Sequence, residues 1–154
     1  MKYFVWETPL LMEPETNTLG LPLLSCRRTW RAASAHKVAN IAFIMIGTND
    51  TQKAIPPEVY EDNLRQIIDI CKINGMHIII STLPKLGMTP LYYKNSYLIN
   101  SYNSVIMKLS NELGLDVCDM SGVEKHYVDG VHFTNAGHKE IANRWANKIL
   151  TSQT

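Results

Sequence analysis

An unbroken apolar run, Ile41-Ala-Phe-Ile-Met-Ile46, stops at Gly47 and restricts the fold of this chain more than any other feature. A strand with one face in water alternates apolar and polar residues, whereas a parallel strand covered on both faces reads as continuously apolar. Residues 76–82 and 115–118 repeat the pattern in shorter form. We therefore expect three neighbouring parallel strands at 41–46, 76–82 and 115–118, and residues 2–6 are a candidate for a further short strand.

Between these segments the apolar residues recur at the three- and four-residue spacing of amphipathic helices. The first predicted helix opens at Pro56-Pro57, where the missing N–H of proline does no harm, and it ends at Asn74-Gly75. Its apolar stripe comprises Tyr60, Leu64, Ile67, Ile68 and Cys71. Cys71 is thus predicted to be a small buried residue of the core.

Two further helices complete the pattern. One is predicted over about 95–113 with Gly114 as its C-terminal stop, and the last is predicted to begin at Asn135 as its cap. Alternating strands and helices imply a parallel sheet with helices on both faces. The predicted fold class is therefore α/β, a single three-layer α/β/α domain over residues 1–154. A further helix over 24–36 is the prediction for the less regular N-terminal part.

Composition and charge exclude several classes of function. The 154 residues carry a net charge of +1, and the 15 basic residues are scattered rather than clustered as a nucleic-acid surface requires. No stretch approaches the ~20 apolar residues of a membrane span, and the N-terminus lacks the apolar region of a secretory signal, so a cytoplasmic protein is the default expectation. The three cysteines include no CxxC pair, so we expect neither a disulfide framework nor a zinc knuckle. The oligomeric state is left open.

Two polar segments are placed to carry chemistry. Gly47-Thr-Asn-Asp50 follows the first buried strand, and Asp129-Gly-Val-His132 lies in the loop before the last predicted helix. Ligands of open parallel sheets bind beyond the carboxyl ends of the strands. Taken singly, each segment has an ordinary explanation, because Gly, Asn and Asp are turn residues and a lone loop histidine is usually solvated.

In this order and spacing the two segments resemble the SGNH/GDSL hydrolase family. The similarity covers residues 40–150: IAFIMIGTND resembles the family's third block with its strand, IIISTLPKLG the next strand and its proline-rich loop, and VDGVHFTNAGHKEIANRWANKIL the last block and terminal helix. The resemblance implies the SGNH-hydrolase, flavodoxin-like form of the three-layer fold, with its N-terminal part incomplete. It also implies a GDSL-type acylhydrolase or esterase, related to lipases, that uses no cofactor.

The resemblance assigns a role to each polar residue. His132 would be the general base, since imidazole gains and loses a proton near neutral pH. Asp129, three residues earlier, would accept the imidazole N–H and stabilise the imidazolium. Asn49 would donate its amide N–H to the developing oxyanion, a contact typically worth about 3 kcal/mol in the transition state. Gly20 is the candidate for the second, backbone donor of the oxyanion hole, and Asp50 is expected to hold the turn or a helix start.

The sequence departs from the family at the nucleophile. The family's first block is a Gly-Asp-Ser after the first strand, and this sequence contains no Gly-Asp-Ser. Ser25 and Ser34 follow Gly20, on the wrong side of it for that block. Ser81 ends a strand near the expected cleft without matching the block, and Cys26, beside two arginines, has an ordinary surface explanation. No residue is assigned as nucleophile, and the short segment before the third block favours a truncated enzyme over a non-catalytic relative.

Two functions from different classes follow from these residues. The first is hydrolysis of carboxylic esters, either acetylated carbohydrates or small acyl esters, by a Ser-His-Asp type mechanism for which this chain has no identifiable nucleophile. The second is a non-catalytic relative that binds a carbohydrate or a protein. A metal site made of His126, His132 and His138 with Asp129 is a weaker hypothesis, because zinc sites show tighter ligand spacing.

Overall fold

The computed structural model describes residues 3–6, 40–90 and 92–152. Within them the chain alternates strands and helices, as predicted from residue 41 onward. The elements in chain order are β1 (Tyr3–Trp6), β2 (Ile41–Ile44), α2 (Thr48–Gln52), α3 (Pro57–Ile73), β3 (His77–Ser81), the 3-10 helix η1 (Tyr93–Asn95), α4 (Leu98–Leu113), β4 (Asp116–Cys118), the 3-10 helix η2 (Val123–His126) and α5 (Asn135–Ser152).

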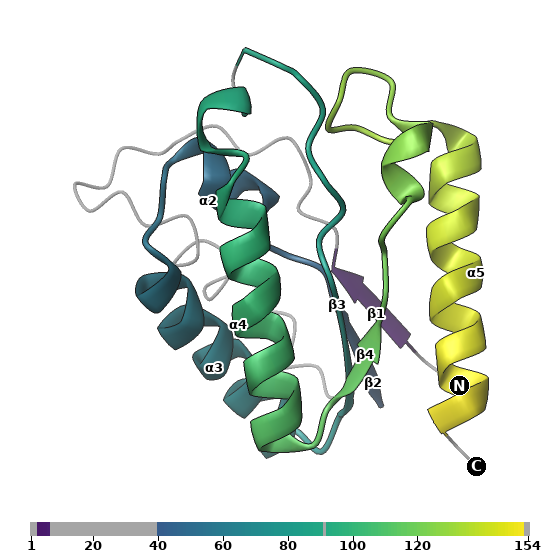
Figure 1. Ribbon diagram of the computed structural model, residues 1–154. Coiled ribbons are helices and arrows are strands. Elements are labelled where there is room, and N and C mark those ends of the chain that lie inside the picture. The colour runs from purple at the N-terminus through teal and green to yellow at the C-terminus, as the bar shows by residue number, and fades with distance from the viewer. Residues whose placement is uncertain (1–2, 7–39, 91, 153–154) are drawn as a thin grey trace, which may run out of the picture.

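The described sheet has four parallel strands in the order β1-β2-β3-β4, so that strands consecutive in the chain are neighbours (Figure 1). The register pairs Ile44 with Ile80 and Ser81 with Cys118. The predicted parallel arrangement is confirmed, and so is the short strand near the N-terminus. All four carboxyl ends therefore lie at one edge of the sheet, which is the edge where ligands bind in folds of this kind.

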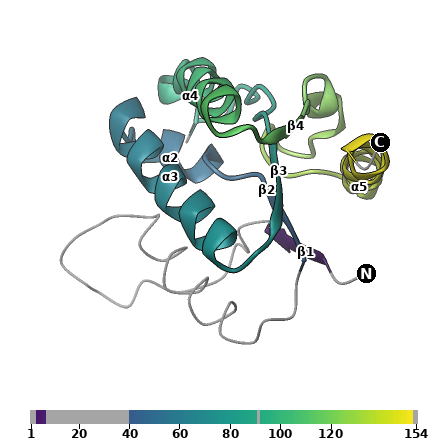
Figure 2. The ribbon, with the colours of Figure 1, turned by 90° about the horizontal axis from the view of Figure 1, so that it is seen from below.

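The central strands supply two hydrophobic layers by simple alternation, since successive side chains of a strand point to opposite faces. Even-numbered residues join the cluster under α3 and α4, which includes Ala42, Ile44, Ile78, Ile80, Leu64, Ile68, Ile106 and Leu109. Odd-numbered residues join the cluster under α5, which includes Ile41, Phe43, Ile79, Ile141 and Trp145. Figure 2 shows the result: α3 and α4 cover one face of the sheet and α5 covers the other. The three-layer fold is thus confirmed.

The ends of α3 and α4 coincide with the breaks that their sequences predict. Pro57 is the first residue of α3, and Asn74 follows its last residue and donates its side-chain amide to the carbonyl of Ile70 at 2.7 Å. Gly114 caps α4 in the left-handed conformation at φ 65° and ψ 42°, which glycine adopts without steric cost. Cys71 is fully buried within α3, as predicted.

Two predicted helix starts are displaced. Helix α4 begins at Leu98 rather than near residue 95, because residues 93–95 form the separate turn η1. The cap of α5 is Thr134, whose Oγ1 accepts the backbone N–H of Gly137 at 3.2 Å, and Asn135 is already helical. The Thr134 N–H is held by the carbonyl of His126 at 2.9 Å, and this tertiary bond decides which of two good capping residues takes the position.

The predicted helix over 24–36 lies outside the described residues. In the described part of the chain, no helix combines the length and the hydropathy that are needed to cross a membrane.

Candidate active site

Asp129 and His132 lie at the tip of a short hairpin between η2 and α5. The backbone N–H of Val128 donates to the carbonyl of His132 at 2.7 Å, and Tyr127 and Phe133 pair as an antiparallel bridge with their rings 4.7 Å apart. The aromatic pair closes the base of the hairpin, and the four residues Asp129–His132 form its turn. The sequence folds tightly here because a short side-chain acceptor and a glycine meet in one turn.

The two side chains of this turn form a hydrogen-bonded pair. His132 Nδ1 lies 2.5 Å from Asp129 Oδ2, and the other carboxylate oxygen accepts the backbone N–H groups of Val131 at 3.0 Å and His132 at 2.8 Å. The hydrogen bond from the His132 side chain, followed by those two backbone bonds, lowers the pKa of Asp129 to about 2. The carboxylate is therefore charged at neutral pH, and the predicted Asp129–His132 pairing is confirmed.

The pairing fixes the chemical state of the imidazole. A carboxylate only accepts hydrogen bonds, so Nδ1 carries the proton and Nε2 carries the lone pair when the ring is neutral. Among the described residues, no group hydrogen-bonds to Nε2 of His132. The side chains of His132 and Asp129 are 46% and 52% exposed, so the pair is open to a substrate from solvent.

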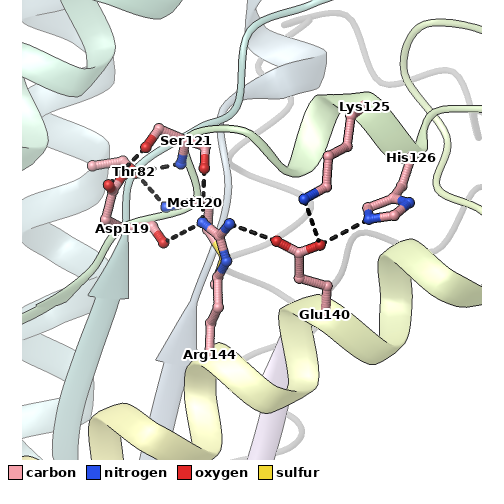
Figure 3. A network of polar contacts seen from close by, with 8 residues as sticks. All are labelled: Thr82, Asp119, Met120, Ser121, Lys125, His126, Glu140 and Arg144. Atoms are coloured by element: carbon pink, nitrogen blue, oxygen red, sulfur yellow. Dashed lines mark hydrogen bonds and ion pairs between the residues drawn. The ribbon is translucent and has the colours of Figure 1, made fainter.

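A polar network behind the hairpin fastens it to α5 (Figure 3). Glu140 of α5 contacts His126 Nε2 at 2.8 Å, Lys125 Nζ at 3.2 Å and Arg144 Nη2 at 2.6 Å. Hydrogen bonds from Arg144, His126 and Lys125 lower the pKa of Glu140 to about 2. Arg144 also donates to two carbonyls of the loop that follows β4, those of Asp119 and Ser121. The network holds both ends of η2, and hence the start of the hairpin, against one helix.

Asn49 lies in the first turn of α2, directly beyond the end of β2. The chain enters this turn through Gly47, whose φ of 133° disfavours any residue with a side chain. A Cβ at Gly47 would also lie 2.7 Å from Leu83 Cδ1 and 3.0 Å from a ring carbon of Tyr60. Glycine is therefore required here for both conformation and space, and it lets α2 begin close against the core.

Asp50, the neighbour of Asn49, points into the protein. Its side chain is only 5% exposed, and its Oδ1 has no hydrogen-bond partner among the described residues. Burial raises the pKa of Asp50 from 3.8 to about 6, against a smaller lowering by its backbone hydrogen bond and by Lys53. The negative charge is felt by Tyr60 and Tyr102, whose rings stack 4.2 Å apart between α3 and α4. Asp50 thus belongs to the core under α2 rather than to the exposed turn.

The loop between β3 and α4 joins the two motifs. The backbone N–H of Gly87 donates to the carbonyl of Gly130 in the hairpin at 2.7 Å. Tyr92, five residues on, donates its hydroxyl to Asn49 Oδ1 at 3.2 Å. One loop therefore contacts both the Asp129–His132 turn and the Asn49 turn, and Figure 1 shows both turns at the carboxyl end of the sheet. The predicted juxtaposition of Asn49 and His132 at a shared edge is confirmed, whereas Tyr92 carries no sequence signal and was not predicted.

None of the serine and cysteine candidates joins this group in the described structure. Ser81 is fully buried within the sheet and donates its hydroxyl to the carbonyl of Ile44 at 3.5 Å, so the expectation that it borders the cleft is wrong. The remaining candidates lie outside the described residues: Gly20, Ser25, Cys26 and Ser34.

The three histidines considered as metal ligands point to separate partners. His126 contacts Glu140, His132 contacts Asp129, and the ring of His138 packs edge-on against Phe133 at 6.0 Å. Across the described residues, no group of three or more His, Cys, Asp or Glu side chains is arranged to hold a metal ion.

The parallel sheet between two helical layers, with its polar turns at the carboxyl edge, is the SGNH-hydrolase form of the α/β fold. The chain belongs to the GDSL-like lipase/acylhydrolase family, which matches residues 16–140.

Solved structures share the architecture at low sequence identity. A GDSL-like lipase from Bacteroides thetaiotaomicron VPI-5482 is 17% identical, with a TM-score of 0.68 over 84% of this chain and 69% of its own. The acetylxylan esterase Axe2 from Geobacillus stearothermophilus is 20% identical, with a TM-score of 0.66 over 84% of this chain and 68% of its own. An α/β hydrolase enzyme from the metagenome of Lake Arreo, Spain, is 18% identical, with a TM-score of 0.65 over 84% of this chain and 68% of its own. No curated protein matches the sequence.

Proposed function

We propose that this chain provides the base and an oxyanion donor of a carboxylic-ester hydrolase, with acylated carbohydrates or small acyl esters as substrates. The observation that carries the proposal is the exposed Asp129–His132 pair, which one loop connects to Asn49 at the same edge of the sheet. Base, orienting carboxylate and amide donor are three of the groups that acyl transfer requires.

Each residue has a defined role in the proposed reaction. A hydroxyl oxygen attacks the ester carbonyl carbon, and His132 Nε2 takes the hydroxyl proton as the new C–O bond forms. Asp129 holds Nδ1–H and stabilises the resulting imidazolium. The carbonyl oxygen becomes an oxyanion, to which Asn49 Nδ2 donates. The intermediate then collapses, and the alcohol departs with the proton from His132. When the attacking hydroxyl belongs to water, this step releases the acid at once. When it belongs to a serine, the acyl group stays on the serine until a water molecule repeats the sequence.

The substrate class follows from exposure and from the relatives. An open pair at the surface suits an acyl group displayed on a larger molecule, such as an acetyl ester of a sugar chain. One of the similar structures, Axe2, is an acetylxylan esterase. An acetylated xylo-oligosaccharide is therefore the first natural type of substrate to test.

The nucleophile limits the rate that we expect. Because the sequence contains no Gly-Asp-Ser, the attacking group in this chain would be a water molecule. With water as the attacking group, His132 acts as a general base without a serine, and a positioned base of this kind typically contributes only about 10²–10⁴-fold. The proposal therefore predicts slow ester hydrolysis that depends on His132 and Asn49, with Gly20 as a candidate for the second oxyanion donor.

The test is acetate release from p-nitrophenyl acetate and from acetylated xylo-oligosaccharides. His132→Ala and Asn49→Ala are expected to reduce the slow release to the rate without protein. His77→Ala is the matched control, because His77 also pairs with an aspartate, Asp116 at 3.1 Å, but lies at the amino end of β3. It should leave the rate unchanged.

Two outcomes would contradict the proposal. Equal rates for the parent chain and His132→Ala would show that His132 does not act as the general base. No release at all, together with saturable binding of the acetylated xylo-oligosaccharide in calorimetry, would instead favour the non-catalytic carbohydrate-binding relative, for which the missing Gly-Asp-Ser is the supporting observation.

A further inference from the structure

Tyr92 is a buried tyrosine whose hydroxyl meets the candidate oxyanion donor. Its side chain is 9% exposed, and the hydroxyl donates to Asn49 Oδ1 at 3.2 Å. The backbone around it is fixed, because the N–H groups of Tyr92 and Tyr93 both donate to the carbonyl of Thr89, at 3.2 Å and 2.8 Å. The tyrosine therefore offers a fixed donor to a side chain on another element.

The Asn49 side chain has little else to orient it. Among the described residues, the bond from Tyr92 is the only hydrogen bond of the Asn49 amide group. The terminal torsion of an asparagine has a broad, roughly two-fold profile, so an unbound amide samples both orientations of its oxygen and nitrogen. A donor on Oδ1 selects one of them, because the amide nitrogen cannot accept the hydroxyl proton.

We propose that Tyr92 is a positioning residue: its hydroxyl holds Asn49 Oδ1 and thereby turns the Asn49 NH2 group toward the carbonyl oxygen of a bound ester. The inference rests on the proposed function for its consequence in catalysis. Its structural part, the selection of one amide orientation, stands on the geometry alone.

The surroundings keep the tyrosine in its donor form. Burial, and to a lesser degree the negative charge of Asp129, raises the pKa of Tyr92 above its ordinary range. The Tyr92 hydroxyl therefore stays protonated at neutral pH, where the Asp129 carboxylate is charged.

Tyr92→Phe removes the hydroxyl and keeps the ring, and Tyr93→Phe is its matched control on an exposed neighbour that is 57% accessible. In ¹⁵N-labelled protein, the side-chain amide signals of Asn49, assigned by their loss in Asn49→Ala, should shift or broaden in Tyr92→Phe and stay in place in Tyr93→Phe. In p-nitrophenyl acetate hydrolysis, kcat should fall about tenfold with KM unchanged, less than the ~10²–10³-fold expected when an oxyanion donor is removed.

A second measurement covers the case in which Tyr92→Phe does not fold. In protein labelled at tyrosine ¹³Cζ, Asn49→Ala should move the Tyr92 signal and leave those of the buried Tyr60 and Tyr102, whose hydroxyls donate to backbone carbonyls. Unmoved Asn49 signals in a folded Tyr92→Phe, or an unmoved Tyr92 signal in Asn49→Ala, would overturn the inference.

The two proposals fail in different ways. If Asn49 signals move but hydrolysis does not depend on His132, the positioning contact stands and the ester-hydrolase function falls. If hydrolysis depends on His132 while kcat and the Asn49 signals are unchanged in Tyr92→Phe, the ester-hydrolase function stands and Tyr92 has no positioning role.

Discussion

The backbone N–H of Gly87 donates to the carbonyl oxygen of Gly130 at 2.7 Å, so the loop after β3 and the hairpin before α5 touch main chain to main chain. Neither glycine has room for a side chain. A Cβ on Gly87 would lie 2.4 Å from Gly130 Cα, and a Cβ on Gly130 would lie 2.7 Å from Thr89 Cγ2 and 3.1 Å from Gly87 Cα. This contact sets the distance between the Asp129–His132 turn and the loop that reaches Asn49.

Gly130→Ala should therefore disrupt the site as well as strain the backbone. Gly130 has a φ of 88°, and Gly122, at 84° with nothing within 4 Å of its Cβ position, is a matched control for the strain alone. Both substitutions should cost about 1–2 kcal/mol for the left-handed conformation, and Gly130→Ala should cost more in denaturant unfolding because of the overlap. Hydrolysis should fall only in Gly130→Ala. Equal losses of stability in the two variants would show that the loops separate freely.

The carboxyl group of Asp129 should titrate near its lowered value. In a ¹³C NMR titration, we expect its midpoint at about 2. A depressed pKa means that the charged form is favoured in the folded state, so this stabilisation is present above the ordinary aspartate pKa and is lost as the pH falls toward 2. His132→Ala should raise the midpoint part of the way, since two backbone donors remain. The control His77→Ala should not move it, and a midpoint near 4 in the parent chain would contradict the pairing.

Asp50 should make the protein less stable as the pH rises. Its pKa is raised from 3.8 to about 6, so the folded state binds the proton more tightly than the unfolded state does. The free energy of unfolding should thus fall between pH 4 and pH 6, by on the order of 3 kcal/mol in total. Asp50→Asn should abolish this fall in urea titrations, whereas Asp62→Asn, on the exposed face of α3, should retain it. Parallel pH profiles for the parent chain and Asp50→Asn would show that Asp50 is not the cause.

A fluorophosphonate probe should leave the chain unlabelled. Covalent capture needs a hydroxyl that a base can deprotonate, and the sequence has no Gly-Asp-Ser to supply one. Intact-protein mass spectrometry checks the result. Stoichiometric labelling at Ser25 or Ser34 would identify a nucleophile that the sequence does not reveal. In that case His132→Ala should abolish the labelling. If the His132→Ala variant is still labelled, His132 is not the base that activates the nucleophile.

The fold was predictable wherever local signals and the hydrophobic pattern agree. The apolar run at 41–46 predicted a strand between two layers, and Gly114 and Pro57 marked helix ends that the structure confirms. Such signals act within a few residues and do not depend on distant contacts. The family resemblance assigned Asp129 and His132 to one pair, and their three-residue separation is one that a single turn can close.

The remaining features depend on contacts between distant segments. Thr134 rather than Asn135 caps α5 because the hairpin bond to His126 selects it. Ser81 ends β3 as predicted, but its hydroxyl turns to the neighbouring strand. Tyr92 lies 43 residues from Asn49 in the sequence, inside a turn-rich loop without periodicity, so no local pattern could assign it a role.

The two halves of the site stand on opposite layers, and this arrangement bears on how the protein loses activity on heating. Asn49 is built on a turn packed beside α3, whereas the hairpin with His132 is fastened to α5 through Glu140 and Thr134. Folded proteins open locally in cooperative units that coincide with such packed elements. An opening that lifts α5 would carry the base away and leave the amide donor in place. The hairpin amides should therefore exchange with solvent deuterium together with α5, and the chain should lose its chemistry while most of its sheet is still folded.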